Sequence, residues 1–220
     1  MKKLDIAVVG SGIGGSLIAS LNSKKNLVLF ERDKNLGGCA STFKRFGSYF
    51  NAGATTFVGY EQNHPIKEIF DEIDFKPDLL KSQVAIRTIQ NKKVLDRTKD
   101  FDKFLEDINE VYPNKNNEIF WKTLKQIDEK FWKLKKLYFA KYSLKAYIKS
   151  AVFVAELLKE FKFDIFKSAK GFIASTLGDI SHEYQSFIDA QLFITVQTTS
   201  ENIPLLSMAL GLSYPFHDVY

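Results

Sequence analysis

Cysteine is almost absent from this chain, because its 220 residues include a single one, Cys39. The chain therefore cannot form an internal disulfide, which is typical of a reducing compartment such as the cytoplasm. We interpret Cys39 as a packed or incidental thiol, with a nucleophilic role as the alternative. Long apolar runs are absent too, since none approaches the roughly 18 residues that a membrane-spanning helix requires. Asp5 interrupts the first apolar stretch, which we interpret as a strand and not as a signal peptide.

Glycine and proline are scarce and occupy different parts of the chain. Nine of the 12 glycines lie at or before Gly59, and all 5 prolines lie after it. Because glycine permits the tight turns that join strands to helices, the first part is predicted to be turn-rich α/β. The second part has mainly helical periodicity. We therefore expect an α/β fold with one region at residues 1–60 and a mainly helical region, with a β-hairpin, at residues 61–220.

The first region contains a glycine-rich loop between two apolar runs. One run ends at Val9 and leads into the sequence GSGIGG at residues 10–15, and a second run at residues 27–30 ends on Glu31. This order predicts a strand, a glycine turn, a helix and a second strand. That is the pattern of a Rossmann-like dinucleotide-binding fold.

Each glycine of the loop has a predicted role. Gly10 allows the tight turn, Gly12 lets the backbone approach a pyrophosphate, and Gly15 lets helix and strand pack closely. The pyrophosphate would lie at the positive N-terminal end of the helix. Glu31 follows Gly10 by 21 residues, where its carboxylate accepts hydrogen bonds from ribose hydroxyls. Its charge also argues against a 2′-phosphate, although the neighbouring Arg32 weakens this second point.

Turn residues and periodicity predict the other elements. We expect a β-hairpin at residues 42–50 that turns near Gly47, a short helix at residues 65–73, and a second hairpin from residues 84–89 and 93–96. Four helical stripes follow: Phe120, Leu124, Ile127, Phe131, Leu134 and Tyr138; Leu144, Ile148, Val152, Ala155 and Leu158; Phe187, Ala190 and Ile194; and Leu205, Leu206 and Leu210. Ser181 is expected to cap the third helix and Pro204 to open the fourth. Core packing is the expected role of each stripe, and the lining of an apolar substrate tunnel is the alternative.

Positive charge is concentrated in the helical region. Residues 121–170 contain 13 lysines, no arginine and 5 acidic residues, a net charge of +8, whereas the whole chain carries +5. A solvated helix face is the simplest interpretation, and contact with an anionic membrane surface is the alternative. Nucleic acid is not expected as a partner, because no nucleic-acid-binding motif is present and lysine lacks the fork with which arginine reads bases.

Two segments after the second strand resemble a known flavoprotein family. The sequence ERDKNLGGCAST at residues 31–42 is similar to the flavoprotein continuation of the glycine motif, in which a second Gly-Gly follows the ribose-binding Glu. The sequence RFGSYFNAG at residues 45–53 resembles an element of the phytoene desaturases and carotenoid isomerases, with Asn51 where that family usually has Asp. The chain resembles the N-terminal part of that family.

The resemblance implies FAD as the cofactor, held mainly through its ADP half. The implied contacts are the backbone of the glycine loop with the pyrophosphate, Glu31 with the adenosine ribose, and the second Gly-Gly with the phosphates and flavin. The complete set of expected cofactor-binding residues is Gly10, Ser11, Gly12, Ile13, Gly14, Gly15, Glu31, Arg32, Gly37, Gly38, Ala40 and Ser41. In such enzymes the flavin performs the hydride chemistry and the protein supplies orientation and a water-poor site.

The resemblance also implies an oxidoreductase, of desaturase, isomerase or saturase type, that acts on an apolar substrate such as a polyene. No catalytic acid or base is assigned, and no metal site is expected, because His64, His182 and His217 lack ligand or triad spacing. Family members are longer, so a C-terminal half that completes the flavin site is expected to be missing and the fold to be incomplete. A catalytically inactive nucleotide-binding remnant and an NAD-dependent dehydrogenase are the alternatives. The expected location is cytoplasmic, including the inner face of a membrane.

Overall fold

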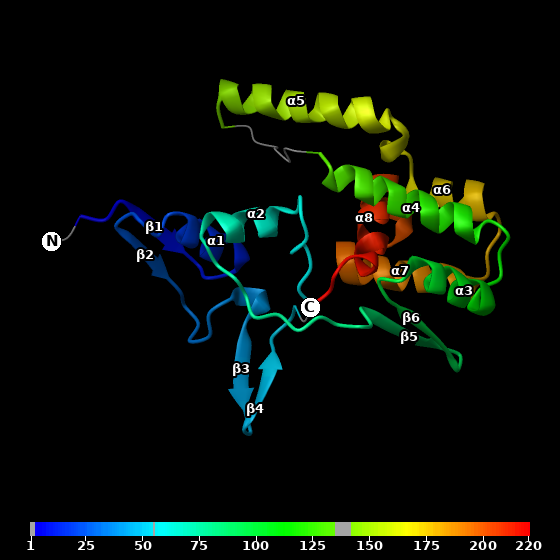
Figure 1. The fold of residues 1–220 in the computed structure, drawn as a ribbon, viewed down its shortest axis with the longest axis horizontal. Coiled ribbons are helices and arrows are strands. Elements are labelled where there is room, and N and C mark those ends of the chain that lie inside the picture. The colour runs from blue at the N-terminus through cyan, green and yellow to red at the C-terminus, as the bar shows by residue number, and fades with distance from the viewer. Residues whose placement is uncertain (1–2, 55, 135–141) are drawn as a thin grey trace. The chain divides into compact units, whose positions relative to one another are not determined.

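The computed structural model describes residues 3–54, 56–134 and 142–220, and divides the chain into two compact units. Unit 1 comprises Met1–Leu80 together with Tyr220, and unit 2 comprises Lys81–Val219 (Figure 1). The expected boundary at residue 60 separated regions of different composition, whereas the units separate where contacts are fewest.

Unit 1 begins with the predicted strand, helix and strand. Strand β1 (Ile6–Val9) leads through the glycine loop into helix α1 (Ile13–Leu21), and strand β2 (Leu27–Phe30) returns parallel to β1, with Ile6 opposite Leu27 and Val9 opposite Phe30. The Gly10 N–H donates to the Phe30 carbonyl at 2.7 Å and so extends the ladder beyond β1. This βαβ unit confirms the Rossmann-like prediction.

A hairpin and a short helix complete unit 1. A 3₁₀ turn, η1 (Gly38–Ala40), precedes strands β3 (Thr42–Arg45) and β4 (Ser48–Asn51), which pair antiparallel. Phe46 and Gly47 join them with φ values of 51° and 80°, which confirms the predicted turn. Helix α2 (Pro65–Glu72) starts at its proline as predicted. Among the described residues of unit 1, Val8 is the one buried apolar side chain, so this unit has little core of its own.

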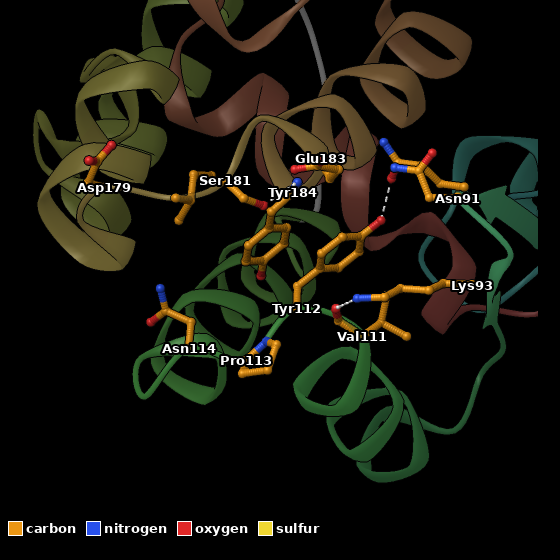
Figure 2. A pocket seen from close by; sticks show the side chains of 12 residues that line it. Asn91, Lys93, Val111, Tyr112, Pro113, Asn114, Asp179, Ser181, Glu183 and Tyr184 are labelled. Atoms are coloured by element: carbon orange, nitrogen blue, oxygen red, sulfur yellow. Dashed lines mark hydrogen bonds between the residues drawn. The ribbon is translucent and has the colours of Figure 1, made fainter.

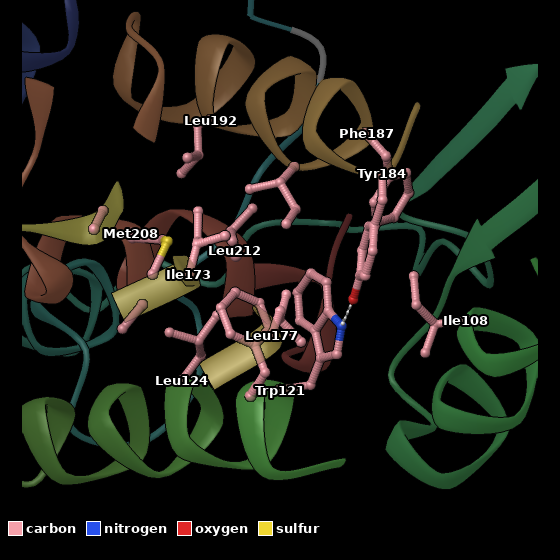
Figure 3. Packing of buried hydrophobic residues seen from close by; sticks show 14 of the residues in the cluster. Ile108, Trp121, Leu124, Ile173, Leu177, Tyr184, Phe187, Leu192, Met208 and Leu212 are labelled. Carbon is pink, nitrogen blue, oxygen red and sulfur yellow. Dashed lines mark hydrogen bonds between the residues drawn. The ribbon is translucent and has the colours of Figure 1, made fainter. Parts of the chain in front are cut away.

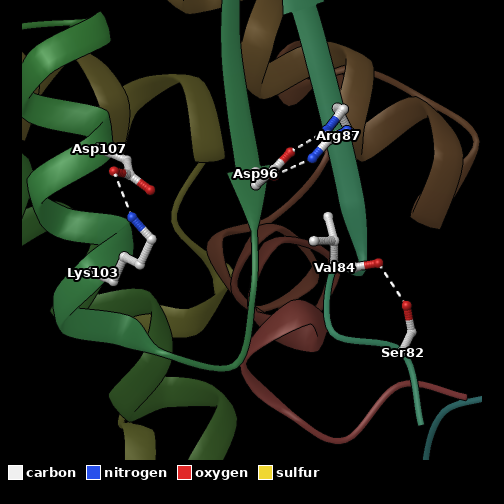
Figure 4. Close-up of polar contacts among 6 residues, drawn as sticks. All are labelled: Ser82, Val84, Arg87, Asp96, Lys103 and Asp107. Carbon is white, nitrogen blue, oxygen red and sulfur yellow. Dashed lines mark hydrogen bonds and ion pairs between the residues drawn. The ribbon is translucent and has the colours of Figure 1, made fainter.

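Unit 2 begins with the second predicted hairpin. Strands β5 (Ile86–Gln90) and β6 (Lys93–Arg97) are joined by Asn91 and Lys92, both in the left-handed region. Across the hairpin, the Arg87 guanidinium donates two hydrogen bonds of 2.7 Å to Asp96, and Ser82 donates to the Val84 carbonyl just before β5 (Figure 4). Arg87 lies directly opposite Asp96 in the strand register, so the pair fixes that register from the exposed face.

Helices form the rest of unit 2. They are α3 (Phe101–Val111), α4 (Asn117–Trp132), α5 (Leu144–Phe161), α6 (Ala169–Leu177), α7 (His182–Val196) and α8 (Leu205–Ser213), with 3₁₀ turns η2 (Asp164–Phe166), η3 (Ser200–Asn202) and η4 (Tyr214–Phe216). Ser181 accepts a hydrogen bond from the Tyr184 N–H and caps α7, as predicted. Pro204 is the N-cap of α8 and not its first residue. Helix α6, capped by Ser168, is an element that the helical stripes did not predict.

The core of unit 2 lies among α3, α4, α6, α7 and α8. Trp121, Leu124, Phe187, Leu192 and Leu212 are fully or almost fully buried there, and the Trp121 indole N–H donates to the Tyr184 hydroxyl at 3.0 Å (Figure 3). Burial of a large aromatic side chain is worth several kcal/mol, and the hydrogen bond satisfies both polar groups. Of the stripe predicted from Phe120 onward, Phe120 and Leu124 lie in this core as predicted, and Ile127, Phe131 and Leu134 are partly buried and pack against buried residues. Tyr138 lies outside the described residues.

The apolar stripe predicted on α5 does not face the core. Leu144, Ile148 and Val152 were expected to pack into the core, but all three are exposed, and the helix packs instead through a face that includes Ala146 and Leu157. Helix α5 is apolar on both faces, so periodicity alone could not identify the packed one. The α7 stripe is also wrong in part: Phe187 is buried, whereas Ala190 and Ile194 are exposed.

Candidate nucleotide-binding site

The candidate site lies at the carboxyl ends of β1 and β2, where the glycine loop turns into α1. In open α/β sheets this edge is where nucleotides bind. Gly10 has a φ of 92°, which favours glycine at the turn off β1. A Cβ atom on Gly15 would lie 1.9 Å from the Gly10 carbonyl oxygen, so α1 can pack against this turn only with glycine at position 15. The predicted roles of these two glycines are confirmed.

The backbone at Gly12 leaves room for a ligand. Gly12 is the N-cap of α1 with φ −61°, and a Cβ added there would meet no described atom within 4 Å. No side chain caps this helix, and its first turn contains no acidic residue, within the part of the chain that the structure describes. The helix therefore supplies no cap or anion of its own at the positive end of its dipole, and this end, together with the open space at Gly12, fits a pyrophosphate.

Glu31 is held by the glycine loop. Its Oε2 atom accepts hydrogen bonds from the Ser11 N–H at 2.7 Å and the Ser11 hydroxyl at 2.6 Å, and its Oε1 atom accepts from the Asp33 N–H at 2.9 Å. The Ser11 hydroxyl, and then the N–H groups of Asp33 and Ser11, lower the pKa of Glu31 to about 2. Glu31 is therefore a fixed anion at neutral pH. A carboxylate has about four acceptor positions, and three of those on Glu31 are occupied. A ribose hydroxyl would donate to the remaining acceptor position.

Ser11 joins three segments and is not exposed to a ligand. Its side chain is buried, and its hydroxyl donates to Glu31 while accepting the Gly37 N–H at 3.1 Å. The second Gly-Gly packs on the first glycine loop, because Gly12 and Gly37 form a parallel bridge and a Cβ on Gly38 would lie 3.1 Å from the Gly12 Cα. Ser11 is one of the expected cofactor contacts, and in the structure its N–H and hydroxyl both bond the Glu31 carboxylate and so position it.

The remaining expected cofactor contacts lie at the edge of the candidate site. Ile13 and Gly14 begin α1 and are exposed, as are Arg32 and Ala40. The Ser41 carbonyl accepts the Ala52 N–H at 2.9 Å, which ties the η1 turn to the end of β4. The structure thus brings together the two glycine loops and Glu31, with Arg32 and Ala40 at the edge.

Acidification is expected to weaken this arrangement. The pKa of Glu31 is lower in the folded chain than its ordinary value of 4.5, so its contribution to stability is complete above pH 4.5 and is lost as the pH falls toward 2. In Ser11→Ala the largest cause is removed, and the carboxyl should titrate closer to 4.5. NMR titration of the Glu31 carboxyl carbon measures both values. Equal pKa values in the two proteins would contradict the hydrogen bonds described above.

Other candidate chemistry is limited. Cys39 is exposed, so it is not a packed thiol, and no group of acidic, histidine or cysteine residues in the described segments could hold a metal ion. His64 is buried, and the His217 Nε2 atom lies 2.5 Å from the Asp128 Oδ2 atom, a pair that the spacing of the histidines did not predict. No helix in the described segments is long and apolar enough to cross a membrane.

Unit 2 contains a polar cavity of about 350 Å³ between the hairpin turn, the end of α3 and the start of α7 (Figure 2). Tyr112 and Tyr184 stack with ring centroids 4.9 Å apart, and Lys93, Asp179 and Glu183 add charge to the lining. This lining does not suit an apolar polyene. The cavity therefore does not supply the tunnel considered from the helical stripes.

Comparisons with known proteins agree with this geometry. Residues 8–73 match the NAD(P)-binding Rossmann-like domain family. The all-trans-retinol 13,14-reductase of Danio rerio is 29% identical over 140 residues, which are 59% of this chain and 23% of that protein, and its Homo sapiens counterpart is 34% identical over 74 residues, 33% and 12% respectively. The chain thus matches about a quarter or less of these relatives' length.

Solved structures share the fold. A Pyrococcus furiosus protein superposes with a TM-score of 0.56 at 11% identity, over 96% of this chain and 43% of its own. A fatty acid isomerase from P. acnes, described as producing CLA, has a TM-score of 0.53 at 15% identity, over 100% and 46%, and a variant of putrescine oxidase with redesigned cofactor binding has 0.53 at 14%, over 98% and 45%. The chain is therefore an α/β protein with a Rossmann-like domain. By name, its relatives in sequence and structure include a reductase, an oxidase and an isomerase.

Proposed function

We propose that this chain is part of an FAD-dependent oxidoreductase that acts on an apolar substrate, and that unit 1 binds the ADP half of the cofactor. The observation that carries the proposal is the combination of an open backbone at Gly12, an uncapped helix N-terminus and a fixed carboxylate at Glu31. Retinol is a polyene alcohol, so the name of the retinol reductase relatives supports a polyene or related lipid as the substrate class. The phytoene desaturase and carotenoid isomerase type remains the finer proposal.

Each part of the site has a distinct task in this proposal. The N–H groups at the start of α1 bind the pyrophosphate, and Glu31 accepts a hydrogen bond from the adenosine ribose. Ser11 holds Glu31 in place. The second Gly-Gly has no side chains and so leaves room for the cofactor. When bound, the flavin supplies hydride transfer, and the protein orients it and excludes water.

Further polypeptide is expected to complete unit 1. Apolar side chains at the ends of both strands are exposed, with Val9 at 84% and Phe30 at 55%, and α1 has no buried residue. A two-stranded parallel sheet is normally covered on both faces, because parallel strands are found in buried sheets. We propose that additional strands or helices cover this surface in the complete enzyme and contribute the contacts to the flavin ring.

Binding of ADP to the 220-residue chain tests the proposal. We expect Gly12→Ala to lower ADP affinity at least about tenfold, because its methyl group enters the space assigned to the pyrophosphate. Gly171→Ala is the matched control, because Gly171 also lies near the start of a helix, α6 of unit 2, and is outside the expected cofactor-binding set. Its added Cβ would make an ordinary contact of 3.7 Å with Ser168, and ADP affinity is expected to stay within about twofold. Isothermal titration calorimetry measures both, and circular dichroism checks that both variants fold.

The alternatives predict different outcomes. Equal ADP affinity in the two variants would contradict the assigned phosphate position. Tight binding of NAD⁺ with no binding of FAD would favour a dehydrogenase. Reduction of bound FAD by any electron donor would argue against a catalytically inactive remnant.

A further inference from the structure

Helix α5 has an apolar face that no described residue covers. Leu144, Tyr147, Ile148 and Val152 are 78%, 55%, 57% and 54% exposed, and they occupy positions i, i+3, i+4 and i+8. Residues at that spacing lie on one side of a helix. Scattered exposed apolar residues need no explanation, but a continuous row of four indicates a binding surface.

This face is separate from the face that packs. The packed side of α5 carries Leu157 and Phe161, which contact α4 and α8 through Ile127, Phe131 and Leu206, and the buried Ala146 lies on the same side of the helix. With about 100° of rotation per residue, the exposed row is centred roughly 150° from the packed row. Figure 1 shows α5 running along the outside of unit 2, beyond α4. The exposed row therefore faces away from the core.

Lysines border the exposed row. Lys145 and Lys149 are both exposed and lie along one edge of this row, about 80° and 120° from its centre at 100° of rotation per residue. Residues 142–155 contain no acidic residue, and the wider segment 121–170 carries a net charge of +8 without a single arginine. An apolar stripe beside lysines is the composition of a helix that lies in the plane of a lipid surface. A tyrosine such as Tyr147 suits that boundary because its ring is apolar and its hydroxyl is polar.

We propose that the exposed face of α5 binds the surface of an anionic membrane. The row formed by Leu144, Tyr147, Ile148 and Val152 enters the boundary between headgroups and acyl chains, while Lys145 and Lys149 contact the anionic headgroups. The charge selects this occupant, because a purely apolar protein partner would gain nothing from a lysine border. The contact is peripheral, which agrees with the absence of a membrane-spanning helix among the described segments.

Sedimentation with lipid vesicles tests this proposal. The 220-residue chain is expected to sediment with vesicles of equal parts phosphatidylcholine and phosphatidylserine at low salt, and to be released by high salt, which screens the lysines. Ile148→Glu, and separately the double variant Lys145→Glu/Lys149→Glu, should each lower partitioning at least about tenfold. These positions are exposed, so the fold should persist, and the fluorescence of Trp121 and Trp132 in unit 2 verifies that.

Ile194→Glu is the matched control, because Ile194 is 59% exposed on α7, outside the α5 row. It should sediment like the unchanged chain, and so should Gly12→Ala, which separates this proposal from the nucleotide site. Equal losses in Ile148→Glu and Ile194→Glu would overturn the proposal. Failure of the chain to bind the anionic vesicles would also overturn it. In that case, a dimer in sedimentation velocity that Ile148→Glu converts to a monomer would assign the exposed face to a second copy of the chain.

Discussion

Gly15→Ala is expected to destabilise unit 1 by about 3 kcal/mol or more, enough to unfold a unit with so small a core. The added Cβ would lie 1.9 Å from the Gly10 carbonyl oxygen and 3.4 Å from a Val8 methyl group. The first of these contacts is with the backbone and cannot be relieved by a rotamer change. Helix α1 must therefore move away from β1, which breaks the packing of the only buried apolar residue described in unit 1.

The two tryptophans make this effect measurable within the chain. Both lie in α4 of unit 2, so tryptophan fluorescence should be unchanged in Gly15→Ala. Hydrogen exchange should show loss of amide protection across β1 and β2, and ADP binding should disappear. Gly14→Ala is the internal comparison, because its Cβ meets open space and alanine favours a helix over glycine by up to about 1 kcal/mol. Equal protection in the two variants would contradict the close packing of α1.

Local patterns were sufficient to predict the elements that position the site. The βαβ unit follows from strand periodicity around a glycine turn, and both hairpins follow from short runs that end in turn residues such as Gly47. Helix α6 was not predicted, because its buried apolar stripe has only three members, Ala169, Ile173 and Leu177, within nine residues, and the Ser168 cap marks its start. A single N-cap residue is weak evidence for a helix when the neighbouring structure is not known.

Features that depend on distant residues could not be predicted. Ser11 and Glu31 are 20 residues apart, and their contact requires the glycine loop and the end of β2 to adopt their folded geometry together. Which face of α5 packs depends on α4 and α8 and not on α5 itself. The buried Arg97 is a third case, since an arginine at the end of an exposed hairpin strand is ordinarily solvated.

Arg97→Ala is expected to destabilise unit 2 by about 3 to 5 kcal/mol. Its side chain is fully buried, and its guanidinium donates to the Gln191 side chain and, at 2.5 Å, to the Leu212 carbonyl. These bonds join the hairpin to α7 and α8. The guanidinium also lies 4.3 Å from the ring centroid of Phe104 and 4.9 Å from that of Trp121. Truncation therefore removes packing, leaves two acceptors unsatisfied and opens a cavity.

The size of this effect depends on which of these losses dominates. Burial lowers the pKa of Arg97, so the charge itself is costly in the core and the surrounding rings and acceptors offset that cost. Arg97→Met restores the volume without the charge and should recover part of the loss, whereas Arg97→Lys keeps the charge but cannot reproduce the fork of hydrogen bonds. If the loss of packing dominates, Arg97→Met should be more stable than Arg97→Lys. If the loss of hydrogen bonds dominates, Arg97→Lys should be the more stable variant.

Arg87→Ala is the matched control for Arg97→Ala, because it removes the same side chain from the same hairpin. Arg87 is 60% exposed and pairs only at the surface with Asp96, so its loss should cost at most about 1 kcal/mol. Urea unfolding followed by tryptophan fluorescence measures unit 2 in each variant. A difference between Arg97→Ala and Arg87→Ala of less than about 1 kcal/mol would mean that Arg97 does not link the hairpin to the helices as described.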